Sequence, residues 1–221
     1  MMSSATAQSS VPESGQRKKR PGIETELRTA KDRILQTSVK LLQRQGYHNT
    51  SIDQIISEAM VSKGNFFHHF KNKEELGYSV IESLRADHAK HLASLLAERS
   101  KNPVQRLFAS LETIVRDPSM RRNGSPIGKL AQELSETHEG FRKKISEIFE
   151  MWISAVSRLF EEAKLMGGLR KDVDCRALAE FWVTHWEGLM LLAGSLPEQS
   201  LIENNLNELK GHLRSLGATS L

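Results

Sequence analysis

Residues 50–76 read TSIDQIISEAMVSKGNFFHHFKNKEEL, and three helix-capping signals fall among these positions. Thr50 or Ser51 can accept a hydrogen bond from a first-turn amide and so cap a first helix. The apolar positions that follow share one helix face: Ile52, Ile55, Ile56 and Ala59. Ser62 can cap a second helix that begins at the next residue, and Asn72 can cap a third. Two short helices and a third are therefore predicted in quick succession.

Two short helices joined by a tight turn are typical of a helix-turn-helix, whose second helix enters the major groove of B-DNA. The expected second helix, residues 63–70, begins with Lys63, which can donate to guanine. Asn65 can make a bidentate contact to adenine, and Gly64 lets the backbone approach the groove closely. The other expected DNA contacts, to phosphates and neighbouring groups, are Thr50, Ser51, Ser62, Phe67, His68, Lys71 and Lys73. The alternative is a small helical hairpin with a solvated polar face.

Charge is distributed unevenly along the chain. Residues 1–73 hold 12 Lys+Arg and 6 Asp+Glu, whereas residues 74–221 hold 19 and 21. A basic module followed by a near-neutral one is typical of a phosphate-binding domain with an attached sensor or assembly domain. Residues 1–25 have too few large apolar groups to fold, so we expect a tail. Its RKKR run, residues 17–20, can serve as a DNA-contacting arm or as a solubilising segment.

Apolar periodicity predicts helices on both sides of the opening stretch. Upstream, residues 29–46 form an amphipathic helix, and downstream, residues 77–99 form a long helix that links two domains. Residues 103–221 lack strand alternation and fit five or six helices, of which 141–166 and 175–194 are the longest. The last of these is apolar almost all round, so we expect it to pack against its own domain and against a second copy.

All three tryptophans lie in these two long helices, where they can contribute to a sensor cavity with a polar handle. The candidate ligand-binding residues are Phe108, Met151, Trp152, Trp182, His185, Trp186 and Met190. For each residue taken singly, ordinary core packing is the alternative, and His185 also fits a hydrogen-bonded core or interface histidine.

A spaced set of residues runs through the first third of the chain: Ile34-Leu35, Gly46, Thr50, Ser62-Lys63-Gly64, Phe70, Lys73 and Glu74-Glu75-Leu76. This set resembles the N-terminal domain of the TetR (tetracycline-repressor) family of bacterial regulators. The resemblance implies an all-helical homodimer whose first three helices bind double-stranded DNA. It also implies a larger C-terminal domain that senses a small molecule and dimerises through the last two long helices in a four-helix bundle.

Two positions depart from that family's pattern. Met60 stands at the turn position that usually holds glycine, so either the turn avoids a positive φ or Met60 is strained by about 1–2 kcal/mol; we expect the altered, unstrained turn. Phe67 stands where a tyrosine hydroxyl commonly reaches a phosphate, so that hydroxyl contact is lost. The way this helix docks is therefore expected to differ from the family's usual mode.

Residues 124–134, GSPIGKLAQEL, resemble a segment in the TetR branch that responds to electrophiles or small unsaturated acids. Ser125 stands where a cysteine often occurs in that branch, so thiol sensing at this position is unavailable. Cys175, near a predicted helix start, would have to replace it. We expect reversible, non-covalent effector binding instead.

Enzymatic and metal-binding motifs are missing from the sequence. No glycine-rich phosphate loop, nucleophile elbow or Cys–His pairing at a known spacing is present, so no catalytic residue or cofactor is expected. His88 and His91 lack further ligands, and no metal is assigned. A lone cysteine and the lack of a long apolar run favour a cytoplasmic protein without a membrane partner.

The sequence thus predicts an all-α fold: an N-terminal three-helix helix-turn-helix DNA-binding domain plus a C-terminal helical ligand-binding and dimerisation domain. The expected boundaries are 1–25 for a disordered basic tail, 26–76 for the DNA-binding domain, 77–100 for the linker helix and 101–221 for the C-terminal domain. The predicted function is a homodimeric repressor that binds a palindromic operator and is released by a small-molecule effector, with the linker helix transmitting the change. The alternatives are a ligand-independent dimeric DNA-binding activator or silencer, and a purely protein-binding helical module.

Overall fold

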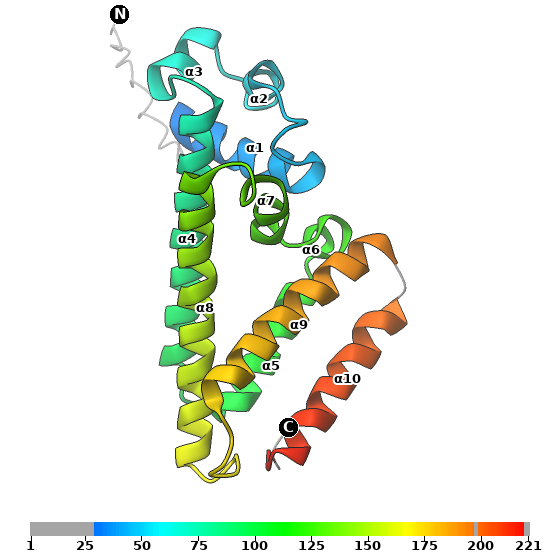
Figure 1. The fold of residues 1–221 in the computed structure, drawn as a ribbon. Helices are drawn as coiled ribbons and strands as arrows, with labels where there is room; N and C mark the ends of the chain where they lie inside the picture. Colours follow the sequence, from blue (N-terminus) through cyan, green and yellow to red (C-terminus); the bar gives the residue numbers. More distant parts are fainter. Residues whose placement is uncertain (1–28, 197–198, 219–221) are drawn as a thin grey trace, which may run out of the picture.

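The structure is a computed structural model and describes residues 29–196 and 199–218, so the basic tail expected at residues 1–25 lies outside the described residues. Within these residues every regular element is an α-helix, which confirms the all-α prediction. The first four helices are α1 (Ala30–Gln45), α2 (Ile52–Glu58), α3 (Lys63–His69) and α4 (Lys73–Ala97). The others are α5 (Pro103–Val115), α6 (Pro118–Asn123), α7 (Pro126–Leu134), α8 (Glu139–Leu165), α9 (Cys175–Ser195) and α10 (Gln199–Ser215) (Figure 1). None of these helices combines the length and apolar character needed to cross a membrane.

The first four helices begin at polar caps that the sequence supplies. Thr29, Ser51, Ser62 and Asn72 each accept a hydrogen bond from the amide three residues further along, at 2.8–3.2 Å. Such a bond satisfies one of the amides that a helix start leaves without a partner. The caps predicted at Ser62 and Asn72 are confirmed, and of the two candidates for α2 the cap is Ser51 rather than Thr50.

The turn between α2 and α3 is left-handed, which corrects the expectation of an altered turn. Met60 has a φ of 51° and is the non-glycine residue with positive φ in the described part of the chain. Its amide donates to the carbonyl of Ser57 at 3.2 Å, and the amide of Val61 donates to Ile56 at 3.2 Å. These two bonds form a Schellman ending, which commonly contains glycine at the left-handed position. The chain keeps this geometry because Ile56 and Val61 both pack against the core there.

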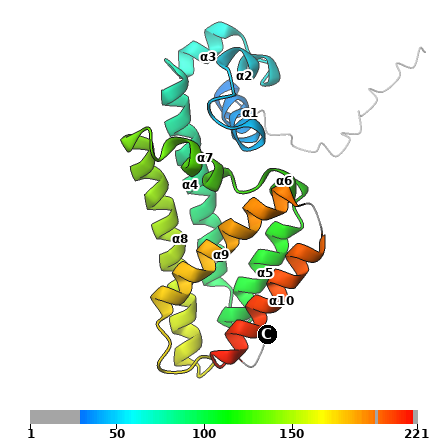
Figure 2. The same cartoon turned by 45° about the vertical axis from the view of Figure 1, so that its right-hand side comes forward.

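The helix that starts at Asn72 is the same helix that was expected to link the two domains. α4 runs without a break from Lys73 to Ala97, so the predicted boundary at 76/77 falls inside it. α8 lies beside α4 and runs in the same direction, from the helix-turn-helix end to the far end of the molecule (Figures 1 and 2).

Two hydrophobic clusters divide the molecule, and α4 and α8 contribute to both. The first cluster joins α1–α3 to α7 and the first halves of α4 and α8; its fully buried members include Ile34, Ile55, Phe66, Val80 and Ile148. The second joins α5, α9 and α10 to the far halves of α4 and α8, and it contains Trp152, Trp182 and Trp186. The DNA-reading helices therefore share a core with α7, which lies far from them in sequence.

Candidate nucleic-acid interface and effector cavity

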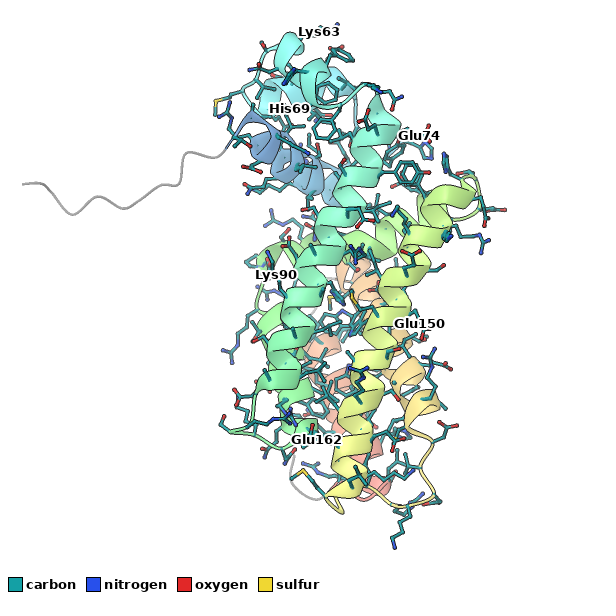
Figure 3. The ribbon with its side chains drawn as sticks, turned by 90° about the vertical axis from the view of Figure 1, so that its left-hand side faces the viewer. Lys63, His69, Glu74, Lys90, Glu150 and Glu162 are labelled. Carbon is teal, nitrogen blue, oxygen red and sulfur yellow. The ribbon has the colours of Figure 1, made fainter. Side chains whose placement is uncertain are left out.

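α3 lies at one end of the molecule and carries the side chains predicted to read bases. Lys63 is exposed there (Figure 3), and its Nζ lies 3.9 Å from Asp53 Oδ1, which makes a long ion pair. Asn65 is exposed on the same helix, while Phe66 is fully buried beneath them and anchors α3 to the core. A Cβ on Gly64 would come no nearer than 3.8 Å to another residue's atoms, so the fold itself does not require glycine at this position.

The neighbouring candidates also lie on the exposed surface of this region. Phe67 is 43% exposed, and His68 and Lys71 are exposed beside it. The hydroxyls of Ser51 and Ser62 accept amide hydrogen bonds as helix caps, and both residues remain exposed. The structure thus gathers most of the predicted DNA-contacting residues around α3.

Thr50 is held inside the protein, whereas Lys73 is partly exposed and lies against the loop between α1 and α2. Thr50 is fully buried, and its hydroxyl donates to the carbonyl of Gly46 at 2.7 Å. The Lys73 ammonium donates to the carbonyl of His48 at 3.3 Å and lies 4.5 Å from the centroid of the Tyr47 ring. Burial lowers the pKa of Lys73. Both side chains fasten the loop between α1 and α2, and Lys71 remains as the exposed lysine for phosphate contact.

α7 clamps this same loop and the end of α1. The Lys129 ammonium donates to the carbonyls of Gln43 at 3.0 Å and Arg44 at 3.2 Å. These carbonyls lie in the last turn of α1, where helix geometry leaves oxygens without partners and favours positive charge. Glu133 accepts a hydrogen bond from the amide of His48 at 3.0 Å. α7 is thus bonded directly to the first helix of the helix-turn-helix unit and to the loop that follows it.

A cavity of about 210 Å³ lies between α1, the α6–α7 segment and α9. Three cationic residues, Arg44, Arg122 and Lys129, contribute to its lining, and Glu187 contributes from α9. Burial raises the pKa of Glu187 to about 7, although a hydrogen bond from the Ser125 side chain acts in the opposite direction. The Glu187 Oε1 atom is buried and has no hydrogen-bond partner within the described residues.

Of the seven residues predicted for a sensor cavity, Met190 lines this one. The other candidates are placed elsewhere: Phe108 packs edge-to-face on Trp182 at 5.3 Å between ring centroids, and Trp152 packs on His88 at 4.8 Å. Trp186 is buried in the second hydrophobic cluster, and Met151 packs against that cluster. His185 is half-buried, and its Nε2 has no hydrogen-bond partner within the described residues.

Sequence reasoning missed Glu187 as a cavity residue, although a signal was present. It is the one charged residue in the apolar stretch 181–196. A lone acidic residue in a helix that is otherwise buried marks a position where packing alone does not explain the residue type.

Cys175 is buried, and its surroundings disfavour the thiolate that a sensing thiol needs. Burial raises its pKa to about 11, so the reactive thiolate is scarce at neutral pH. The part of the chain that the structure describes contains no group of three His, Cys, Asp or Glu side chains arranged to hold a metal ion.

Two family models match the chain. Residues 34–77 match the model described as bacterial regulatory proteins, tetR family, and residues 101–207 match the one described as tetracyclin repressor-like, C-terminal domain. The chain belongs to the TetR family. The resemblance found in residues 29–76 is thereby confirmed and extended over most of the C-terminal region.

Similar proteins agree with this membership of the TetR family. The transcriptional regulator AcuR of Cereibacter sphaeroides is 33% identical over 189 residues, which cover 83% of this chain and 84% of AcuR. The transcriptional repressor DhaR of a Mycobacterium species is 28% identical over 158 residues, covering 72% of this chain and 79% of DhaR. The crystal structure of the regulatory protein TetR from Rhodobacter sphaeroides gives a TM-score of 0.76 at 29% identity, covering 83% of this chain and 98% of that one.

As a TetR-family member, the chain is a DNA-binding transcriptional regulator. The prediction of a regulator rather than an enzyme is confirmed, because the matched proteins are transcriptional regulators.

Proposed function

We propose that this TetR-family protein is a homodimeric repressor that binds a palindromic operator and is released when a small molecule enters the cavity beside α7. The observation that carries the proposal is the position of α7, which lines the cavity through Gly128 and Lys129 and grips α1 through the same Lys129. A ligand that displaces α7 changes the support of the DNA-reading helices. The equilibrium then shifts toward a form that no longer fits the operator.

The route from cavity to DNA differs from the one expected from sequence. The linker helix α4 lies in both hydrophobic clusters and spans the molecule, whereas α7 is a short helix that contacts the cavity and the helix-turn-helix unit directly. We infer that α7 carries the change and that α4 serves as the support against which it moves.

A dimer surface is available on the outward face of α9. Exposed or half-exposed positions there recur at alternating spacings of four and three residues, as in helices that pack in bundles: Ala177, Phe181, Thr184, Gly188, Leu191 and Ser195. Phe181 is 45% exposed and Leu191 is 55% exposed. A Cβ on Gly188 would meet no atom within 4 Å, so this face is open in the single chain.

α8 and α10 both lie beside α9, and both carry charged groups on their exposed sides, such as Glu208 and Arg214 of α10. The outward side of α8 carries charged groups such as Arg142, Glu147 and Arg158, which are costly to bury between subunits. α10 packs beside α9 (Figure 2). The centroids of the Phe181 and His212 rings lie 5.2 Å apart. The dimer surface that we propose is therefore the exposed face of α9, and its pairing with α8, which the family resemblance implies, stays a prediction.

Sedimentation velocity tests the dimer surface. Phe181→Glu places a charge in the proposed interface and should shift the protein from dimer to monomer at micromolar concentration. Leu165→Glu is the matched control, because Leu165 is 88% exposed at the far end of α8 and lies outside the surface. Dissociation in both variants, or in neither, would overturn the assignment.

Selection of duplexes from a random-sequence DNA library tests the operator. A two-fold dimer should return an inverted repeat with half-sites about one helical turn, or a multiple of it, apart. A single half-site or a direct repeat contradicts the proposal, and a lack of any DNA selection favours a protein-binding module.

Release of the selected duplex by metabolites separates the repressor from its main alternative. Fluorescence anisotropy of the complex should fall when the effector is added. If no compound in a broad metabolite collection releases the DNA, a ligand-independent activator or silencer is the better description. The name of the relative DhaR, described as a repressor, favours the first reading.

A further inference from the structure

Glu187 is a buried carboxyl that shares a cavity with three cations and yet pairs with none of them. Arg44 forms its ion pair with Glu58 at 3.1 Å, and the Lys129 ammonium is engaged by two backbone carbonyls. No ion pair between Arg122 and an acidic group occurs among the described residues, and no basic residue there contributes to the raised pKa of Glu187. The cavity therefore keeps an acidic site and a basic site apart.

The acidic site is incomplete in the protein alone. Leaving a buried acceptor without a partner destabilises the folded state, so such atoms are rare in folded proteins. The neighbours of Glu187 on the buried side of α9, Trp186, Leu189 and Met190, are apolar, and an apolar residue at 187 would avoid this cost. Because Oε1 is closed to solvent in this conformer, a rotation of the Glu187 side chain must turn it toward the cavity, where a ligand that donates a hydrogen bond supplies the missing partner.

The basic site favours an anion of planar, two-oxygen geometry. Arg122 is exposed at the cavity, and guanidinium groups bind carboxylates through two parallel hydrogen bonds. Met190 and Leu191 add apolar wall to the same cavity. The lining thus offers an anion site, a short apolar surface and an acceptor for a donor group.

We propose that the cavity binds a small organic acid that also carries a hydroxyl or amino group, with its carboxylate at Arg122 and Arg44 and its donor group on Glu187. This inference rests on the effector role proposed above for the same cavity. Selectivity follows from the separated sites: an acid without a donor leaves Oε1 unpaired, and an alcohol or amine without the carboxylate leaves the cations unpaired.

Isothermal titration calorimetry on the full chain, without DNA, tests the ligand class with five-carbon probes of one shape. These are 2-hydroxy-3-methylbutanoate, valine, 3-methylbutanoate and 3-methyl-1-butanol. At pH 8, where the Glu187 carboxyl is ionised, at least one of the first two should bind about 10- to 100-fold more tightly than both of the last two, as expected for a hydrogen bond to a charged group. Equal affinity for 3-methylbutanoate, or heat from none of the four probes, overturns the inference.

Two variants locate the binding site. Arg122→Gln should weaken binding at least tenfold, whereas Arg121→Gln should not, because Arg121 is the exposed neighbour that does not line the cavity. Glu187→Gln should weaken valine more than the hydroxy acid, since a Gln oxygen still accepts from a hydroxyl but no longer balances an ammonium. Equal losses in the two arginine variants would refute the site.

Failure of this inference is distinguishable from failure of the proposed function. The calorimetry reports binding to the chain alone, whereas operator selection and release by a broad metabolite collection report repression. Release by a compound outside the hydroxy and amino acids would leave the repressor proposal intact and exclude this ligand class.

Discussion

Replacing Glu187 with Gln should remove a pH dependence from the stability of the folded protein. The carboxyl has an ordinary pKa of 4.5 when unfolded and a pKa raised to about 7 by burial in the folded state. A group with a raised folded pKa contributes fully only below the unfolded pKa, and its contribution is lost as the pH rises through the folded pKa. Between pH 5 and pH 8 the native protein should therefore become less stable on account of this residue.

The magnitude follows from the displacement of the pKa. Each pH unit of difference between the folded and unfolded pKa corresponds to about 1.4 kcal/mol, so full ionisation of Glu187 costs about 3 kcal/mol. Most of that cost falls between pH 5 and pH 8. Relative to the unaltered chain, Glu187→Gln should gain about 2 to 3 kcal/mol in free energy of unfolding over this range, because an amide does not ionise.

Urea unfolding followed by tryptophan fluorescence measures this difference, since all three tryptophans are buried in the core. Protein concentration must be the same throughout, because a dimer unfolds in a concentration-dependent way. Glu147→Gln, at an exposed position of α8, is the matched control and should show no comparable gain. A difference between Glu187→Gln and the unaltered chain that is the same at pH 5 and pH 8 would refute the reasoning.

Three further changes concern the DNA-reading unit. Met60→Gly should raise the free energy of unfolding by about 0.5–1 kcal/mol, because the left-handed strain that it relieves, about 1–2 kcal/mol, exceeds the cost of the added chain entropy of glycine. A loss of stability in urea unfolding would contradict this. Lys63→Ala should weaken binding to the selected operator by about 1–3 kcal/mol and reduce the preference for one base, whereas Lys71→Ala should weaken binding to all duplexes and lower the slope of log affinity against log salt concentration by about one. Equal effects of both variants on every sequence in anisotropy titrations would reject that division. Gly64→Ala should leave the thermal unfolding midpoint unchanged or higher, because nothing in the chain crowds a Cβ at this position, yet it should weaken operator binding. Unchanged affinity would show that the backbone does not approach the groove closely.

Local signals in the sequence located the helix starts well. Ser62 and Asn72 cap α3 and α4, and the apolar spacing that predicted α1, α8 and α9 agrees with their buried residues. These features depend on hydrogen bonds and contacts between residues three or four apart, so the order of residues is enough to predict them.

Three other positions take contacts that these local rules did not specify. Thr50 has the hydroxyl of a cap, but in the folded chain it is buried and donates to Gly46. Lys73 has the charge of a phosphate contact, yet the His48 carbonyl and the Tyr47 ring hold it. Met60 takes a positive φ because the packing of its neighbours outweighs its own backbone preference.

By itself, the sequence determined the all-helical class, the helix-turn-helix and the outward side chains of α3, because each follows from periodicity and capping within a few residues. Only the tertiary structure decided how that unit is supported and where a ligand can enter. Lys129 meets the end of α1 across 85 or more positions, and Glu187 shares a cavity with residues from α1, α6 and α7. Contacts of that range depend on how the helices pack around two shared cores, and no local pattern specifies them.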